Sequence, residues 1–187
     1  MNGMDMVLSH DEKRELCEIA RESIASKLLH REPSLKAPSR GCLQPGGVFV
    51  TLHENGQLRG CIGRMQSGRP LCETVKEMAL AAAFEDPRFV PLSKAEYSEI
   101  NIEITVLGPM NRIHGKEDFV IGVHGLYIAA RGRTGVLLPQ VATEYGWVNE
   151  EFLSHLCQKA GLPISAWSDP AAELFAFEGL IFSEAAS

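Results

Sequence analysis

Residues 47–63 read Gly-Val-Phe-Val-Thr-Leu-His-Glu-Asn-Gly-Gln-Leu-Arg-Gly-Cys-Ile-Gly, and this stretch decides the fold. Its first half is rich in β-branched and aromatic side chains, which favour strands. The central Asn55-Gly56 pair is preferred in two-residue hairpin turns. With that turn, the pattern predicts a hairpin in which Val50 pairs with Cys61. Apolar side chains fall on both faces, so we expect protein to cover both sides of this sheet.

The second strand of the hairpin carries an arginine and a cysteine two residues apart. Alternate side chains of a strand share a face, so Arg59 and Cys61 should project together, with Cα atoms roughly 6.5 to 7 Å apart. A guanidinium that close lowers the pKa of a thiol and favours the nucleophilic thiolate. Gly60 and Gly63 indicate a bulge, or a place where another backbone or a ligand approaches closely. The alternative is a cysteine that packs as a small hydrophobic residue.

Length and composition are those of an ordinary globular protein. The chain has 187 residues, 45% of them hydrophobic and 22% charged, which allows one compact unit or two interlocked subdomains. The formal net charge of -6 argues against a broad surface for nucleic acid. Arg131 and Arg133 are expected in a solvated hairpin turn. We therefore expect no nucleic-acid partner.

The cysteine pattern and the apolar pattern together indicate a cellular compartment. The five cysteines are irregularly spaced and form no C-x-x-C pair, which fits a reducing cytoplasm better than a disulfide framework or a zinc ribbon. Residues 1–8 lack the cationic start and apolar run of a secretion signal. No apolar stretch approaches the roughly 20 residues that a membrane helix needs. We expect a cytoplasmic protein without a membrane partner.

Helical and extended patterns follow one another without a βαβ rhythm. We expect a helix from the Ser9 cap to His30, an irregular connection over 31–46, a helix from Pro70 to a point before Glu85, strands over 100–106, 126–130, 135–138 and 174–182, and a helix over 150–160 capped by Asn149. Hairpins separated by helices predict an α+β fold with largely antiparallel sheets flanked by helices.

Six blocks of the sequence together resemble one protein family. They are GVFVTLHENGQLRGCIG from Gly47, AAAFEDPRF from Ala81, INIEITVLGP from Ile100, IGVHGLYI from Ile121, GVLLPQVATEYGW from Gly135 and FLSHLCQKAGL from Phe152. In these blocks the chain resembles the AMMECR domain family, called AmmeMemoRadiSam system protein A in bacteria and archaea. The hallmark LRGCIG is intact over residues 58–63, and the match covers nearly the whole chain.

The resemblance implies a fold and partners but no reaction. It implies a single AMMECR-type domain over residues 1–187, built as two interlocked α+β lobes with a cleft near the hallmark. Family members are often encoded beside a Memo-like protein and a radical S-adenosylmethionine protein, so these two are the implied partners. The family has no established activity, so the resemblance identifies a site without naming its chemistry.

A catalytic cysteine usually needs a base close to it. His124 is the first candidate, because glycines frame it in the stretch 122–125 and allow a loop to present its side chain. The alternative is a histidine whose hydrogen bonds are satisfied on the surface or in the core. The sequence favours both alternatives equally.

Three further polar residues are candidates for substrate contacts. Gln140 and Glu144 are four residues apart and share one helical face, where they would bind a polar substrate group or simply cap the helix and face solvent. Arg88 follows Asp86 across a proline in a fixed turn. It would reach the cleft or pair with Asp86 in a structural salt bridge.

Metal and cofactor patterns do not occur in this sequence. The six histidines form neither H-x-x-x-H nor H-E-x-x-H, and the chain has no P-loop and no G-x-S-x-G motif. The clustered cysteines that an iron–sulfur cluster requires do not occur either. We expect no metal and no cofactor, and any radical chemistry would belong to a partner.

Three functions remain open, and we favour the first. An enzyme or enzyme component would use Cys61 on a small polar or anionic substrate, with Arg59 lowering the thiol pKa and His124 as base. A non-catalytic adaptor would bind the Memo-like or radical S-adenosylmethionine partner while Cys61 merely packs. A binding module would hold a nucleotide or another anion on the backbone amides around Gly60 and Gly63.

Overall fold

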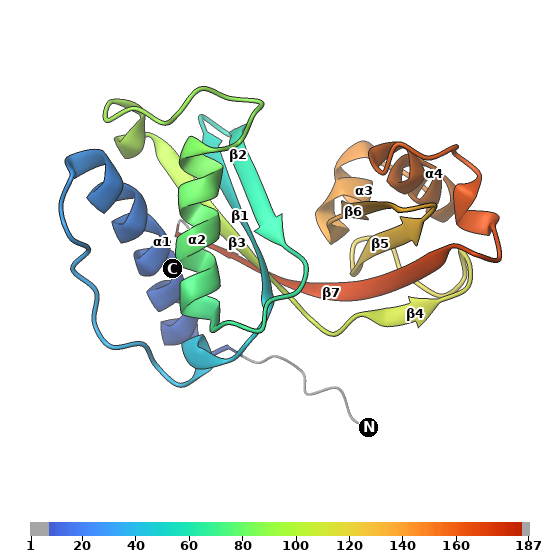
Figure 1. The fold of residues 1–187 in the computed structure, drawn as a ribbon, viewed down its shortest axis with the longest axis horizontal. Coiled ribbons are helices and arrows are strands. Elements are labelled where there is room, and N and C mark those ends of the chain that lie inside the picture. The colour runs from blue at the N-terminus through green and yellow to red at the C-terminus, as the bar shows by residue number, and fades with distance from the viewer. Residues whose placement is uncertain (1–7, 185–187) are drawn as a thin grey trace. The chain divides into compact units, whose positions relative to one another are not determined.

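The computed structural model describes residues 8–184. Residues 1–7, on which most of the inference about a secretion signal rests, lie outside the described residues. The elements follow in the order α1 (His10–Leu29), the 3₁₀ turn η1 (Gly41–Leu43), β1 (Gly47–Glu54), β2 (Gln57–Arg64), α2 (Leu71–Phe84), η2 (Glu96–Ser98), β3 (Ile100–Leu107), β4 (Asn111–Ile113), β5 (His124–Ala130), β6 (Arg133–Leu137), α3 (Pro139–Tyr145), α4 (Asn149–Lys159), η3 (Ala166–Ser168) and β7 (Glu173–Ser183) (Figure 1). Within residues 8–184, no helix is both long enough and apolar enough to cross a membrane.

The chain divides into two compact units, each with its own hydrophobic core. In the described residues, the first unit comprises 8–107 and 180–184, and the second comprises Gly108–Gly179. The long strand β7 therefore contributes its last residues to the first unit and the rest to the second.

In the first unit, α1 and α2 cover one face of an antiparallel sheet (Figure 1). The strand order is β2-β1-β3, and β7 follows β3. Val48, Val50 and Leu52 of β1 and Ile102 and Ile104 of β3 are fully buried in the core that the two helices share. Because β2 has a strand on one side only, its other edge meets the rest of the unit through side chains and loops.

The two helices of the first unit form where the sequence predicts them. Ser9 and Glu12 make the predicted capping box: Glu12 N donates to Ser9 Oγ at 3.3 Å, and Ser9 N donates to Glu12 Oε2 at 2.8 Å. Pro70 is the N-cap of α2, which ends at Phe84, ahead of the Asp86-Pro87 turn. Both predictions are confirmed.

The hairpin of β1 and β2 closes on the predicted turn. Asn55 and Gly56 both have positive φ, 51° and 76°, as a twisted two-residue turn requires. Glu54 pairs with Gln57, so the register at the turn is the expected one.

Beyond the turn, the register differs from the prediction. The pairing shifts between Leu52 and His53, which makes Arg59 the extra residue of a β-bulge. The predicted pairing of Val50 with Cys61 is therefore wrong. Cys61 lies opposite Thr51 instead. A shift of one residue moves side chains to the other face, so the thiol is on the face turned away from the helices.

The second unit is also an antiparallel sheet with helices packed on it. β4 and β5 flank the first part of β7, and β6 pairs with β5 to form the predicted hairpin. Helix α4 begins at Asn149, but its N-cap is Val148, so the predicted cap at Asn149 is wrong. Glu151 Oε2 accepts a hydrogen bond from Val148 N at 3.0 Å, and Asn149 Nδ2 donates to the carbonyls of Lys116 and Phe119.

The predicted fold class is confirmed. Every strand pair with a described register is antiparallel, and helices flank the sheet of each unit. The short strand β4 and the 3₁₀ turns carry no clear sequence pattern and were not predicted.

Candidate functional site

Three polar side chains of different chemistry line up across the first sheet. Cys61 of β2 pairs with Thr51 of β1, and Thr51 pairs with Glu103 of β3, so the three share one face. Thr51 Oγ1 donates a hydrogen bond to Cys61 Sγ at 3.3 Å. Thr51 is buried, whereas Cys61 and Glu103 are half-buried. A thiol, a hydroxyl and a carboxylate thus follow one another on the face opposite the helices.

The turn Asp86-Pro87-Arg88 makes hydrogen bonds to the backbone of Cys61 at the unpaired edge of β2. Cys61 N donates to Asp86 Oδ2 at 2.9 Å, and Arg88 Nη2 donates to the Cys61 carbonyl at 3.2 Å. Two backbone groups that a neighbouring strand would otherwise satisfy are bonded to side chains instead. The position of Cys61 therefore depends on this turn.

Asp86 and Arg88 form the salt bridge that was one of the two sequence expectations. Asp86 is 4% exposed and accepts bonds from Arg88 Nη2 at 2.7 Å, Arg88 Nε at 2.9 Å and Arg88 N at 3.1 Å. The guanidinium of Arg88 holds the pKa of the Asp86 carboxyl well below its usual range, and the Cys61 amide adds to this effect. Asp86 in turn raises the pKa of Arg88, and so does the nearby Cys61 thiol.

Arg88 keeps the two N–H groups of Nη1 for another partner. Its side chain is 49% exposed. Among residues 8–184, no hydrogen-bond partner is found for Arg88 Nη1. A fixed cation with an open donor therefore lies next to the backbone of Cys61.

Arg59 has partners other than the thiol. It is 6% exposed; its Nε donates to Glu96 Oε1 at 2.9 Å and its Nη2 donates to the Val90 carbonyl at 2.9 Å. The Arg59 guanidinium lowers the pKa of Glu96 to about 2. Arg59 Nη1 is buried and has no hydrogen-bond partner among the described residues. Arg59 thus ties β2 to the loop after α2, and the cation beside Cys61 is Arg88.

The two glycines of the LRGCIG segment lie where close approach requires them. A Cβ at Gly60 would be 2.3 Å from the Ala82 carbonyl oxygen of α2. A Cβ at Gly63 would be 2.2 Å from the ring of Phe49. The predicted bulge and the predicted approach of another backbone are both present at Gly60. Packing alone therefore explains why both positions are glycine.

The remaining candidates belong to the second unit. His124 is the first residue of β5, and its Nδ1 accepts a hydrogen bond from Val120 N at 3.0 Å. The neutral imidazole therefore carries its proton on Nε2. On α3, Gln140 Oε1 is buried without a partner among the described residues, and Glu144 is exposed. The second unit thus holds three of the eight candidates, His124, Gln140 and Glu144. The first unit holds the other five, which are Arg59, Gly60, Cys61, Gly63 and Arg88.

Sequence reasoning missed Thr51, Glu103 and Glu96. The first two lie on strands that the sequence predicts, but only the true register places them in line with Cys61. Glu96 carries a local signal, since Ser93 and Glu96 form a reciprocal pair in which Ser93 N donates to Glu96 Oε2 at 2.8 Å. Its ion pair with Arg59 spans 37 residues and leaves no local pattern.

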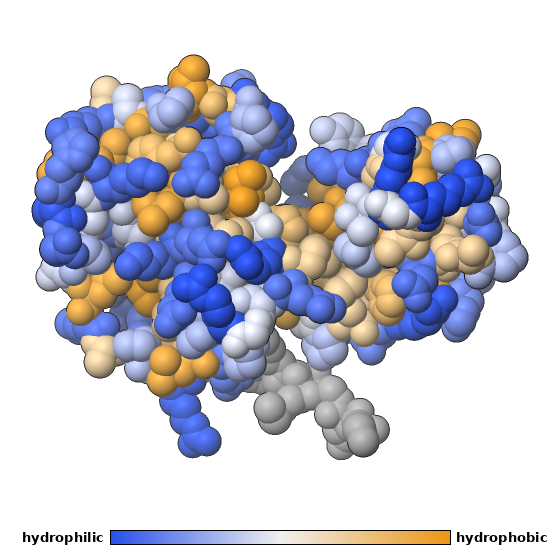
Figure 2. Space-filling view, in the orientation of Figure 1, coloured by the Kyte–Doolittle hydropathy of each residue, from blue (hydrophilic) through white to orange (hydrophobic). Residues whose placement is uncertain are grey.

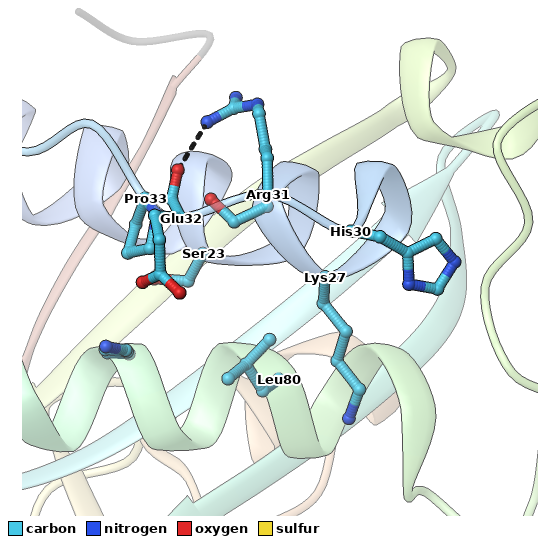
Figure 3. A pocket seen from close by; sticks show the side chains of 9 residues that line it. Ser23, Lys27, His30, Arg31, Glu32, Pro33 and Leu80 are labelled. Atoms are coloured by element: carbon cyan, nitrogen blue, oxygen red, sulfur yellow. Dashed lines mark hydrogen bonds between the residues drawn. The ribbon is translucent and has the colours of Figure 1, made fainter.

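A separate hollow of about 500 Å³ lies between α1 and α2 in the first unit (Figure 3). Lys27, His30 and Arg31 line it, together with Leu80 of α2. Arg31 is paired with Glu22, and Lys27 lies 3.9 Å from Glu85. None of the candidate residues lines this hollow, so its shape does not define the site at Cys61.

Across residues 8–184, no three His, Cys, Asp or Glu side chains cluster in a way that could hold a metal ion.

The chain is similar to proteins from several archaea. It is 42% identical to a protein of Methanothermobacter thermautotrophicus, over 95% of this chain and 96% of that protein. It is 40% identical to a protein of Methanopyrus kandleri, over 95% of this chain and 90% of the relative. The crystal structure of an uncharacterized protein from Pyrococcus horikoshii superposes with a TM-score of 0.88 at 33% identity, covering 95% of this chain and 93% of that one.

The family assignment rests on the match along the whole chain rather than on one motif. The family model described as AMMECR1 matches residues 17–182, which include most of the first unit, the whole second unit and every candidate residue. The chain therefore belongs to the AMMECR1 family.

Proposed function

We propose that this protein is an enzyme component in which Cys61 acts as a thiol nucleophile on a small polar or anionic substrate. The observation that carries the proposal is the combination at Cys61 of a half-buried thiol, a hydroxyl that donates to its sulfur, and a fixed cation, Arg88, that donates to its backbone carbonyl. A hydrogen-bond donor and a guanidinium both favour the thiolate.

Arg88 is the residue that would recognise the substrate. Its Nε and Nη2 are held by Asp86, so its orientation is fixed before a ligand arrives. Its Nη1 remains to donate to a carboxylate or phosphate, the groups that a guanidinium binds best. Gly60, Gly63, Gln140 and Glu144 remain proposed substrate contacts from the sequence alone.

His124 enters the proposal in a modified role. With Nδ1 accepting from Val120 N, the neutral ring offers Nε2–H as a donor. It would act as a base only after releasing the Val120 amide. Under that condition His124 remains a proposed base from the sequence alone.

The other cysteines make reactivity at Cys61 easy to recognise. Burial raises the pKa of Cys17 to about 12 and that of Cys42 to about 11. Burial also raises the pKa of Cys72 and Cys157. These four thiols are poor nucleophiles near neutral pH, so rapid alkylation of the folded protein should map to Cys61.

The test compares an anionic and a neutral alkylating reagent at Cys61. We expect the ratio of the iodoacetate rate to the iodoacetamide rate to be about 3- to 10-fold higher at Cys61 than in N-acetylcysteine, because Arg88 attracts the carboxylate of iodoacetate. This factor corresponds to a difference of about 1 kcal/mol in activation free energy. Arg88→Gln should remove this preference. The matched control is Arg112→Gln, another paired arginine with a side chain 47% exposed. An unchanged ratio in Arg88→Gln would refute the proposed substrate class.

The cellular setting of the proposal comes from the resemblance and from the cysteine pattern. We propose that the protein works in the cytoplasm beside a Memo-like protein and a radical S-adenosylmethionine protein, which would supply any radical chemistry. Co-purification of these proteins when they are co-expressed tests the physical association.

A second candidate function is a non-catalytic adaptor for the same partners. The observation that favours it is a group of exposed side chains near Trp147, among them Tyr145 and Val148. An adaptor would still bind its partner as Cys61→Ala but would lose it on substitution of Trp147. An enzyme component would lose activity in Cys61→Ala whether or not it binds a partner.

A further inference from the structure

The second unit carries a surface that mixes exposed apolar side chains with carboxylates. It is formed by residues 116–124 and 144–151, and we call it the acidic-aromatic surface. Val120, Val123, Tyr145 and Val148 are 57%, 47%, 68% and 62% exposed. Figure 2 shows one face of the molecule, on which hydrophobic side chains reach the surface among hydrophilic ones.

The two segments of this surface lie side by side. Asn149 Nδ2 donates to the Phe119 carbonyl at 3.4 Å, and Lys116 Nζ lies 3.1 Å from Glu150 Oε2. Phe119 and Trp147 both pack on Phe152, with ring centroids 6.0 and 6.4 Å away. The exposed valines of one segment and the exposed Tyr145 and Val148 of the other therefore belong to one region of the second unit.

An aromatic stack gives this surface a rigid flat part. The Trp147 ring stacks with the Tyr145 ring, with centroids 4.9 Å apart and an interplanar angle of 15°, and with the His155 ring, at 3.8 Å and 10°. Gly146 ends α3 in the left-handed conformation, with φ at 67°, which lets the two neighbouring rings stack. Tyr145 is thus held in place by its stacking partner while most of its surface meets solvent.

The surface carries a net negative charge. Residues 116–124 and 144–151 contain five carboxylates and a single lysine, a formal excess of four negative charges. Lys116 pairs with Glu150. Glu117 and Glu144 are exposed and make no ion pair within the described residues. Nucleic acid and anionic membranes would be repelled by such a surface.

We propose that the acidic-aromatic surface docks a cationic segment of a partner protein. Arginine or lysine side chains of that segment would lie on the Tyr145 ring and beside Glu144, where the cation meets both an aromatic face and a carboxylate. Apolar side chains of the same segment would contact Val120 and Val148. The proposal assigns a docking surface and a chemical class of partner to the second candidate function, the non-catalytic adaptor. It does not depend on Cys61.

The test uses a synthetic peptide of about 14 residues that alternates pairs of arginine and leucine, with a fluorescent label, at physiological salt. By anisotropy we expect a dissociation constant of about 10 to 50 µM and at least about tenfold weaker binding to the Tyr145→Ser, Glu144→Gln variant. The control variant is Ile164→Ser, Glu99→Gln, which removes another exposed apolar side chain, 57% exposed against 68% for Tyr145, and one exposed carboxylate elsewhere.

Each outcome decides for or against this surface. Binding that weakens only in the Tyr145→Ser, Glu144→Gln variant supports the proposal. No binding at about 200 µM peptide, equal weakening in the control variant, or equal binding of a peptide with glutamate in place of arginine would overturn it. Alkylation of Cys61 is measured in the unchanged protein beside peptide binding. Rapid alkylation without peptide binding would overturn this surface alone, and peptide binding with slow alkylation would overturn the Cys61 proposal alone.

Discussion

At the scale of single residues, two arginines near Cys61 have different roles. Arg59 is buried and holds Glu96 and the Val90 carbonyl, so its charge is used to fasten β2 to a loop. Arg88 is half exposed and fixed by Asp86, so its charge remains available to a ligand. Arg59 is thus the buried, stabilising cation, and Arg88 is the exposed cation to which we assign substrate binding in our proposal.

Replacing Arg59 should destabilise the protein. Arg59→Ala leaves Glu96 and the Val90 carbonyl without their donor, and we expect the free energy of unfolding to fall by about 3 kcal/mol. Urea denaturation followed by circular dichroism measures this change. Arg69→Ala is the control, since Arg69 is exposed and its ion pairs should contribute at most about 1 kcal/mol. Equal effects of the two substitutions would contradict the role given to Arg59.

A methyl group at Gly60 should disturb the packing of α2 on β2. The new Cβ would meet the Ala82 carbonyl oxygen at 2.3 Å, and a backbone atom cannot move aside easily. We expect Gly60→Ala to cost about 1 to 3 kcal/mol. Thermal unfolding measures the cost. Gly68→Ala, where the added Cβ has no neighbour within 4 Å, should change stability by less than about 0.5 kcal/mol.

At this scale, the sequence predicts residue types better than it predicts partners. It identifies Arg59, Cys61 and the two glycines as special, and the bulge and the close approach at Gly60 follow from them. It cannot identify Glu96 as the partner of Arg59, because that ion pair forms only after α2 and its following loop have folded back. Side-chain direction near a bulge depends on such long-range contacts.

At the scale of elements, the loop over 85–99 fastens the edge strand β2. It supplies Asp86 to the Cys61 amide and Glu96 to the Arg59 guanidinium. Two carboxylates of this loop thus accept hydrogen bonds from the edge of β2 that has no neighbouring strand. The LRGCIG segment is held in place by charges, which makes its stability depend on pH.

Acid should weaken this attachment. Both carboxyls have a lower pKa in the folded protein, Glu96 at about 2 against its ordinary 4.5, so their stabilisation is complete above about pH 4.5 and is lost as the pH falls toward 2. We expect the urea midpoint to fall between pH 5 and about 2.5. The Asp86→Asn, Glu96→Gln variant should be less stable at pH 6 and should show a smaller fall. An equal fall in both proteins would show that other groups cause it.

The elements themselves were predicted well, because their signals are local. The capping box at Ser9, the turn at Asn55 and the alternation over Ile100–Leu107 each depend on residues within a few positions. The glycines indicate a bulge, but the predicted register left it out, since nothing near Arg59 in the sequence distinguishes one register from the next. A one-residue error there assigned Cys61 to the wrong face of the sheet.

At the scale of the whole molecule, two separate cores stabilise two units. Leu52 and Ile102 belong to one core, Leu126 and Phe152 to the other. The end of β7 returns to the first unit, where Glu184 pairs with Arg21. Arg21 also donates to the carbonyls of Tyr97 and Ile100 at 2.8 Å each. One arginine therefore joins α1, η2, β3 and the residue after β7.

Removing that arginine should affect the two units unequally. In Arg21→Ala, the Glu184 carboxylate and two carbonyls lose a charged donor, which we expect to cost about 2 to 3 kcal/mol. Hydrogen exchange should then be faster at Leu52 and Ile102 while Leu126 and Phe152 exchange at their original rates. Uniform loss of protection would mean that the two cores unfold together.

The reactivity of Cys61 in the folded protein tests the central claim most directly. The rate of iodoacetamide alkylation at Cys61 is measured by peptide mapping at neutral pH, in native protein and in urea. With Thr51 and Arg88 favouring the thiolate, alkylation should be about 3- to 10-fold faster in the native protein than in the unfolded chain, and Arg88→Gln should remove most of that difference. A Cys61 that reacts only after unfolding would show that its thiol merely packs.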